Sequence, residues 1–187
     1  MRFVDTDLAD AWLLEPDKNI DQRGYFVRLR CAREFAEQGL PGGFVQTNLS
    51  YNRTARTFRG LHYQASPSRE GKLVRCIRGA IADVIVDLRP GSRSYLRHQW
   101  FNLDATQLQA LFVPAGFAHG FLTLADDTEV LYEMSDYYQP ELARGIRWDD
   151  PALGIVMPKK VACINPREAE YPDLDEDTLT IFTEINV

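Results

Sequence analysis

The sequence predicts an all-β fold, either a sandwich or a barrel. From residue 44 onward, short runs of alternating apolar and polar residues succeed one another, and turn-forming residues separate them. Short strands at this spacing are typical of antiparallel sandwiches and barrels, whereas parallel βαβ units would place a helical pattern between strands. The predicted strands are residues 44–51, 57–64, 72–78, 81–88, 98–103, 108–113, 119–124 and 128–134.

The N-terminal part of the chain is more varied. Its first residues predict an irregular or short-strand entry, with residues 12–14 as a candidate strand. Residues 21–24 have turn chemistry, and residues 24–30 then alternate as a strand. Residues 32–38 form the most helix-like stretch of the chain, and Gly39 supplies a C-terminal stop.

Two further segments bear on the domain organisation. Arg78-Gly79-Ala80 joins two predicted strands and is short enough for a tight hairpin. From Pro140 onward prolines recur, and they favour loops and short turns over regular elements. We therefore expect residues 1–187 to form one domain with an N-terminal arm and a C-terminal wrapping tail.

Composition and charge argue against several classes of function. The formal net charge of −6 argues against nucleic acid as a partner, although a local basic pocket for an anion remains open. No apolar run approaches the ~20 residues that span a bilayer, and the N-terminus lacks the basic-then-apolar pattern of a signal peptide. The cysteines, Cys31, Cys76 and Cys163, are odd in number and far apart. They predict reduced thiols and therefore a cytoplasmic protein, and the lack of a spanning run predicts that it has no membrane partner.

Lys72 opens a predicted strand whose apolar residues look inward. Alternation places it on the face of Val74 and Cys76, so its ammonium would enter the barrel at one rim. In that position the group needs an anion or loses its charge. The competing interpretation is that the side chain leaves the core at the strand end and stays solvated.

His62 lies in a segment, residues 57–64, that otherwise resembles core. In a regular strand it would face the side opposite to Arg59, but a bulge at Gly60 would let both side chains reach one cavity. Tyr132 points inward by the same alternation. Both residues are also compatible with an ordinary structural role, a tyrosine in particular with a buried, hydrogen-bonded hydroxyl.

His119, Asp83 and Asp87 are candidates for binding a metal or for supporting a histidine. His119 ends a P-x-G-x-x-H spacing that matches one half of the metal signature of cupin barrels. The other half would be H-x-H, but His62-Tyr63-Gln64 lacks the second histidine. Two histidines make a poor first-row metal site, so we expect no metal. Asp83 and Asp87 have two possible roles: one of them would be solvated, and the other would orient a histidine by accepting its ring proton.

Taken together, the chain resembles the sugar-nucleotide epimerases of the dTDP-4-dehydrorhamnose 3,5-epimerase family. The matching motifs run in order from about residue 20 to residue 158. They are Asp21–Phe26, Phe44–Ser50, Arg59–Gln64, Gly71–Arg75, Ile81–Arg89, Val113–Phe121 and Trp148–Pro151. The resemblance implies a cupin-type jelly-roll barrel with one or two short helices, and a homodimeric isomerase that uses no metal or organic cofactor.

The resemblance also implies a reaction. The substrate would be a nucleotide-diphosphate 4-keto-6-deoxy sugar, most specifically dTDP-4-dehydro-6-deoxy-glucose, whose keto group acidifies the neighbouring C–H bonds. His62 would remove such a proton, Lys72 would stabilise the enolate oxygen, and Tyr132 would return a proton to the opposite face. Glu168 would support the catalytic histidine.

Further residues would hold the substrate. By resemblance, His119 and Asp83 form a supporting pair near the sugar, and Tyr138 stacks on the base. The fixed fork of an arginine suits the diphosphate. The predicted substrate-binding residues are Arg23, Gln46, Asn48, Arg59, His119, Tyr138 and Arg167.

Four positions depart from the family pattern. Arg28 and Ala143 stand where relatives usually carry glutamate, Met157 replaces a tryptophan, and Glu168 replaces an aspartate. The first two changes remove negative charge and hydrogen-bond acceptors from the expected pocket, which leaves the nucleotide and the sugar open.

Several alternatives remain. The enzyme could invert only C3 or only C5, or act on a GDP- or CDP-linked sugar. A 3,4-ketoisomerase would use the same barrel, but its histidine pattern differs from that around His62. A non-catalytic sugar-nucleotide-binding protein would keep Arg23, Arg59 and Tyr138 and would not need a base or an acid. A metal-dependent cupin dioxygenase would need a fuller ligand set.

Overall fold

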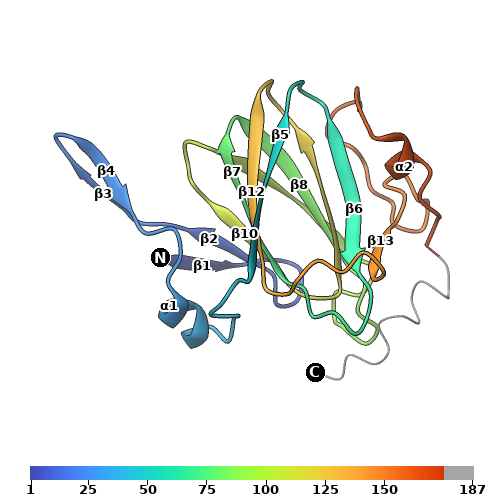
Figure 1. The fold of residues 1–187 in the computed structure, drawn as a ribbon, viewed down its shortest axis with the longest axis horizontal. Helices are drawn as coiled ribbons and strands as arrows, with labels where there is room; N and C mark the ends of the chain where they lie inside the picture. The colour runs from blue at the N-terminus through green and yellow to red at the C-terminus, as the bar shows by residue number, and fades with distance from the viewer. Residues whose placement is uncertain (175–187) are drawn as a thin grey trace.

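The all-β prediction is confirmed by the computed structural model of the protein, which describes residues 1–174 (Figure 1). The strands are β1 (Arg2–Asp5), β2 (Trp12–Glu15), β3 (Lys18–Asp21), β4 (Gly24–Val27), β5 (Gln46–Asn52), β6 (Phe58–Gln64), β7 (Lys72–Arg78), β8 (Ala80–Asp87), β9 (His98–Asp104), β10 (Ala110–Val113), β11 (Phe117–Thr123), β12 (Thr128–Met134) and β13 (Ala143–Gly145). The helices are α1 (Ala32–Glu37) and α2 (Pro166–Ala169). Strands β5 to β12 and helix α1 match the predicted elements within one or two residues at each end.

Two antiparallel sheets face each other and form the walls of a barrel. One sheet has the order β1-β2-β10-β7-β12-β5, and the other has the order β13-β6-β11-β8-β9. Consecutive strands such as β7 and β8 belong to different sheets, so the chain crosses repeatedly from one wall to the other. This crossing pattern is that of a jelly roll.

The link Arg78-Gly79-Ala80 is a corner between the two sheets, and its interpretation as a hairpin is wrong. β7 pairs with β10 and β12, whereas β8 pairs with β9 and β11. Gly79 has a φ of +77°, and a Cβ there would lie 2.4 Å from Thr128 Oγ1. Glycine therefore allows the chain to turn between the walls beside the start of β12.

Three apolar clusters hold the layers together. The first lies between the sheets and joins Val74 and Val130 of one wall to Ile85 of the other. The second covers the outer face of the sheet that contains β8 and β11. The third, which includes Phe35 of α1, lies against β2, β7 and β10. Each sheet is thus buried over part of both faces, which explains why strands such as β8 are buried almost along their whole length.

The N-terminal arm differs from the sequence prediction. The expected strand at 24–30 ends at Val27, and β4 pairs with β3 in a separate two-stranded sheet. The turn predicted at 21–24 joins these two strands. The β3–β4 hairpin projects from the barrel in Figure 1. The pairing of β4 with β3 ends at Val27 opposite Lys18, so residues 28–30 pair with no strand of the described chain and the alternation seen in the sequence does not continue as a strand.

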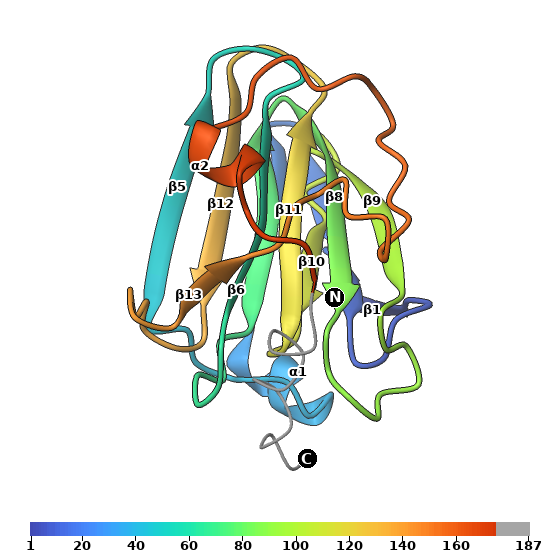
Figure 2. The same cartoon turned by 90° about the vertical axis from the view of Figure 1, so that its right-hand side faces the viewer.

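The tail after Pro140 packs across the barrel, as Figure 2 shows for the orange and red segment. Its buried residues Ile146, Leu153 and Ile155 belong to the second cluster, and Met157 packs against them. The part of the predicted wrapping tail beyond residue 174 lies outside the described residues. Within residues 1–174, neither helix has the length and apolar character needed to cross a membrane.

A bulge in β6 shapes the barrel interior, as the sequence predicted. His62 pairs with His119 and Arg59 pairs with Phe121, so β6 carries one more residue than β11 between these two pairs. Gly60, within the bulge, has a φ of +136°, and a Cβ there would lie 2.5 Å from Gly120 Cα. The extra residue shifts the alternation, and Arg59 and His62 consequently face the same cavity.

Replacing Gly60 should therefore be costly. We expect Gly60→Ala to lower the free energy of unfolding by about 2–5 kcal/mol, because the new methyl group meets backbone and the φ angle is unfavourable for an L residue. Urea titration followed by circular dichroism measures this change. Gly43→Ala is the matched control, since nothing lies within 4 Å of a Cβ at Gly43. Equal stability of the two variants would contradict the close packing of β6 on β11.

Candidate active site

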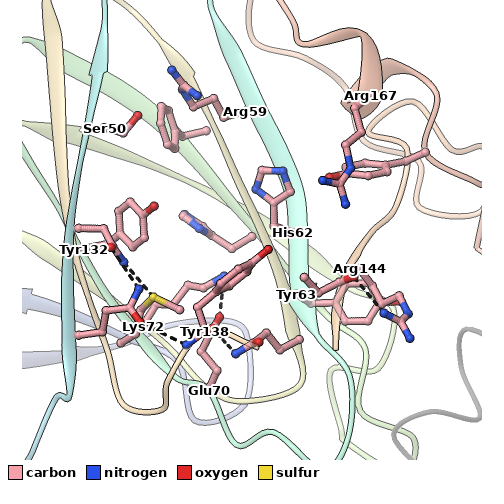
Figure 3. Close-up of a pocket in the computed structure, with 18 residues that line it drawn as sticks. Ser50, Arg59, His62, Tyr63, Glu70, Lys72, Tyr132, Tyr138, Arg144 and Arg167 are labelled. Atoms are coloured by element: carbon pink, nitrogen blue, oxygen red, sulfur yellow. Dashed lines mark hydrogen bonds and ion pairs between the residues drawn. The ribbon is translucent and has the colours of Figure 1, made fainter. Parts of the chain in front are cut away.

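A cavity of about 450 Å³ opens between the two sheets (Figure 3). This volume is in the range of small-molecule sites. Side chains of β5, β6, β7, β11 and β12 line it, and the segments around β13 and α2 complete one side. Predicted site residues that line the cavity are Gln46, Asn48, Arg59, His62, Lys72, His119, Tyr132, Tyr138 and Arg167. Residues of both walls thus meet around one space.

His62 is held by a carboxylate from the tail. Its Nε2 lies 2.8 Å from Glu168 Oε1, and Glu168 is only 8% exposed. Glu168 belongs to α2, whose N-terminus is capped by the Asn165 side chain accepting a 3.0 Å hydrogen bond from the Arg167 backbone N–H. The predicted pairing of Glu168 with the histidine is therefore present in the structure as a contact, and it fixes the orientation of the imidazole.

Tyr171 stands beside this pair. Its ring meets the His62 ring edge to face, with 5.9 Å between the centroids. It also lies against Gly145, where a Cβ would come within 2.2 Å of the tyrosine ring. Gly145 therefore lets the tail approach β6 closely enough to place Tyr171 at the cavity and Glu168 against His62.

His119 and Asp83 form a second histidine–carboxylate pair. His119 Nε2 lies 2.8 Å from Asp83 Oδ2, and Asp83 is fully buried behind the cavity wall. Burial raises the pKa of the Asp83 carboxyl, and His119 and Lys72 oppose that effect. The expectation that one of Asp83 and Asp87 is solvated is wrong, because both lie on the inner face of a strand that is covered on both sides. Asp87 accepts hydrogen bonds from Arg89, Ser92 and Ser94 instead.

Lys72 enters the barrel, which is the first of the two positions that the sequence left open. Lys72 is 9% exposed, and it lies on the same inner face of β7 as Val74 and Cys76, which are fully or almost fully buried. Its Nζ lies 3.0 Å from Glu70 Oε1. The alternative of a solvated lysine at a strand end is therefore wrong, because the ammonium has a buried counter-charge within the barrel.

Tyr132 faces the cavity from the opposite wall to His62. The tyrosine is on β12 of one sheet and the histidine is on β6 of the other. Burial raises the pKa of the Tyr132 phenol, Arg59 opposes the rise, and Glu70 adds to it. The hydroxyl consequently keeps its proton at neutral pH and is available as a donor.

One rim of the cavity is lined by hydrogen-bonding side chains. Arg59 Nε donates to Asn52 Oδ1 at 2.7 Å, which anchors the guanidinium beside the opening. Gln46 Nε2 donates to Asn48 Oδ1 at 3.2 Å, and Gln46 Oε1 accepts from the Tyr138 backbone N–H. Tyr138 is 50% exposed, so its ring is free to contact a ligand. These residues suit an anion with an attached aromatic group.

Arg23 and Arg28 do not line the cavity of their own chain. Arg23 occupies the β3–β4 turn and pairs with Asp21 at 2.6 Å. Arg28 pairs with Glu34 of α1 at 3.1 Å. Ala143, by contrast, does line the cavity and leaves space there instead of a carboxylate.

Glu70 and Tyr171 are two of the cavity residues that the sequence prediction missed. Glu70 stands two positions before Lys72, and the period of two along an extended segment is a signal that could have paired them. Tyr171 has no comparable signal, because only the return of the tail to β6 brings it to His62. Among residues 1–174 there is no group of three or more His, Cys, Asp or Glu side chains placed to hold a metal ion.

Comparisons with known proteins agree on the family of this chain. Residues 5–176 match the family model described as dTDP-4-dehydrorhamnose 3,5-epimerase. A protein of that name from Methanothermobacter thermautotrophicus is 44% identical over 94% of this chain and 96% of its own length. Another from Sinorhizobium fredii is 41% identical over 94% and 91%. The crystal structure of the Bacillus anthracis enzyme, with TDP and PPi bound, is 38% identical and superimposes with a TM-score of 0.89 over 92% of this chain and 99% of that one.

The two histidines of the cavity should differ in reactivity. Diethyl pyrocarbonate acylates an accessible imidazole nitrogen, and the His62 side chain is 41% exposed whereas that of His119 is 9% exposed. We expect peptide mass spectrometry near neutral pH to find His62 modified first and His119 only after unfolding. Equal rates for both residues would contradict the described burial, and the partly exposed His98 serves as an internal reference.

Proposed function

Because the chain belongs to the dTDP-4-dehydrorhamnose 3,5-epimerase family of cupin-type isomerases, we propose that its cavity inverts C3 and C5 of dTDP-4-dehydro-6-deoxy-glucose. One observation supports this more than any other. A histidine on one wall and a tyrosine on the other face the same space, and a lysine enters it from the wall that carries the tyrosine (Figure 3). Inversion needs a base on one side of a carbon and an acid on the other, and this arrangement supplies both.

His62 is the proposed base. When its Nε2–H is donated to Glu168, the lone pair of the neutral ring lies on Nδ1, which can accept the proton from the sugar carbon. The imidazolium formed in that step is stabilised by the Glu168 carboxylate at 2.8 Å. Glu168 thus acts through His62 and need not touch the sugar.

Lys72 is the proposed electrophile. Removing a proton beside the 4-keto group moves charge onto the keto oxygen and creates an enolate. A fixed ammonium in a mostly buried site stabilises that charge more strongly than water would. The Lys72 ammonium lies in the cavity and satisfies this requirement.

Tyr132 is the proposed acid. Its protonated phenol can return a proton to the face of the sugar carbon opposite His62, and this step completes the inversion. The His119–Asp83 pair lies on the same wall as His62 and would hold the sugar by hydrogen bonding.

The nucleotide and diphosphate would occupy the rim. Arg59 and Arg167 present guanidinium groups at the cavity, which suit phosphate oxygens, and Tyr138 offers a ring for the base. Gln46 and Asn48 add amide groups. Ala143, which departs from the family pattern, lies in the cavity, so it is a position where sugar or base selection would differ. Met157 packs in the tail cluster, away from these groups.

We extend the proposal to a homodimer in which Arg23 enters the partner's cavity. The β3–β4 hairpin that carries Arg23 projects from the barrel and exposes Ile20 and Phe26 to 79% and 72%. Such apolar residues at the tip of an arm are typical of a surface that association buries.

The three cysteines, all within the described residues, are unpaired, which agrees with a reducing cytoplasmic location.

The edge of the first sheet is where the partner would dock. β5 is an edge strand, and its outward residues Leu49 and Tyr51 are about half exposed. Its inward residues Gln46 and Asn48 line the cavity. A hairpin docked along this edge would therefore cover apolar surface and bring Arg23 to the rim of the cavity.

Proton exchange tests the function. Incubation of dTDP-4-dehydro-6-deoxy-glucose with the enzyme in heavy water should remove the proton NMR signals at C3 and C5, and loss at one carbon only would indicate a single-centre epimerase. His62→Ala should lower exchange by about 10²–10⁴-fold, since it removes the general base. Tyr132→Phe should retain part of the exchange while impairing inversion. Near-normal exchange in His62→Ala would reject His62 as the base, and no exchange by the native enzyme with any nucleotide-linked keto sugar would favour a binding protein.

Mixing two inactive variants tests the shared site. Arg23→Ala should bind substrate weakly and His62→Ala should lack the base, so each alone should have little activity. In a heterodimer the cavity that retains His62 receives an intact Arg23 from the other subunit, and random exchange of subunits should restore about one quarter of the native sites. Failure to regain activity after confirmed exchange would mean that Arg23 does not act across the interface.

A further inference from the structure

Glu70 is a buried carboxylate at the cavity that the proposed reaction does not use. It is 8% exposed, and both of its oxygens are engaged. Oε1 lies 3.0 Å from Lys72 Nζ, and Oε2 accepts a 2.6 Å hydrogen bond from Gln64 Nε2. A carboxylate occupied by two donors is poorly placed to take a proton from a substrate, so its contacts indicate a different task.

We propose that Glu70 is a positioning residue that keeps Lys72 charged and aimed at the 4-keto oxygen, an inference that rests on the proposed function. The lysine stem is long and flexible, and an ammonium in a mostly buried site is retained only when it has an opposite charge nearby. The side chains of Lys72 and Glu70 are 11% and 4% exposed, so solvent supplies little of that stabilisation. Glu70 provides both the charge and a fixed direction.

The carboxylate is itself held from the opposite wall. Gln64 belongs to β6, and its Oε1 accepts a 2.7 Å hydrogen bond from the Gln139 backbone N–H. Its Nε2 also donates to the Tyr137 carbonyl at 3.2 Å. Lys72 belongs to β7 of the other sheet. The chain of contacts Gln64–Glu70–Lys72 therefore joins the two walls, and it fixes the ammonium relative to His62 on the same strand as Gln64.

Glu70 also acts on the proposed acid. After burial itself, the negative charge of Glu70 contributes to the raised pKa of Tyr132, against the opposite effect of Arg59. One carboxylate thus favours the charged form of the electrophile and the protonated form of the acid. The other titratable groups that face Lys72 are Asp83 on β8, which interacts with it electrostatically, and His119 on β11, which lines the same cavity.

The test is the pH dependence of proton exchange in Glu70→Gln, which removes the charge and keeps the size of the side chain. Without its counter-charge, the buried ammonium of the variant releases its proton more readily as the pH rises. The basic limb of the pH profile is the range in which the exchange rate falls as the pH rises. We expect this limb to lie about one pH unit lower in the variant, so that at a given pH on the limb the variant is roughly tenfold slower than the native enzyme. Glu70→Asp keeps the charge and should largely restore the native limb. Glu37→Gln makes the same charge change on an exposed position of α1 and should leave the profile unchanged.

A second measurement does not depend on turnover. Competitive acetylation of the amines over a range of pH, read by mass spectrometry, follows the reactivity of Lys72 directly. We expect Lys72 to become reactive at lower pH in Glu70→Gln than in the native protein or in Glu37→Gln. An unchanged exchange profile together with unchanged Lys72 reactivity would overturn the inference. If the native enzyme catalysed no exchange at all, the proposed function would fail, while the acetylation result would still decide whether Glu70 holds the lysine.

Discussion

Charged groups inside the barrel require partners, and this constraint organises the site. A charge removed from water without compensation is too costly to retain in a folded protein. The cavity meets the requirement with three pairs, His62–Glu168, His119–Asp83 and Lys72–Glu70, each separated by 2.8–3.0 Å. Each pair has a carboxylate that is at most 8% exposed. The groups proposed to act on the substrate are thus held in place before it binds.

The barrel divides its interior between packing and chemistry. Residues such as Val74, Ile85 and Val130 fill the space between the sheets with a continuous apolar cluster. The same strands β7, β11 and β12 also carry Lys72, His119 and Tyr132 on their inner faces. The apolar cluster makes the walls rigid, and a rigid wall allows side chains from opposite sheets to keep the spacing that proton transfer requires.

Two segments outside the barrel strands complete the proposed site. The tail brings Glu168 and Tyr171 to His62, and Gly145 makes room for their approach. The β3–β4 hairpin carries Arg23 away from the cavity of its own chain, which is why we propose a role for it in a second subunit. A barrel of this kind offers a common interior, and the arms that reach it can vary without disturbing the walls.

Alternation in the sequence was sufficient to predict the strands from β5 to β12 and the inward direction of Tyr132, whereas for Lys72 it left an inward and a solvated position both open. These features depend on the period of two along a strand, which is a local property. The bulge that brings Arg59 and His62 together could be anticipated from Gly60, because glycine marks a departure from regular pairing.

Only the tertiary structure decided the features that depend on contacts between distant segments. Local patterns predicted a hairpin at Gly79 and a solvated carboxylate on β8, and both were wrong, since pairing partners and cover on both faces are set by the whole barrel. Residue patterns alone did not pair Glu168 with His62; the family resemblance implied this contact, and the path of the tail produces it. The path of the hairpin takes Arg23 away from the cavity of its own chain. The sequence by itself therefore determined the strands of the barrel, most of their inward faces and the family. The fold decided how the buried charges pair, because a charge inside a protein is stabilised by the neighbours that the folded chain brings to it.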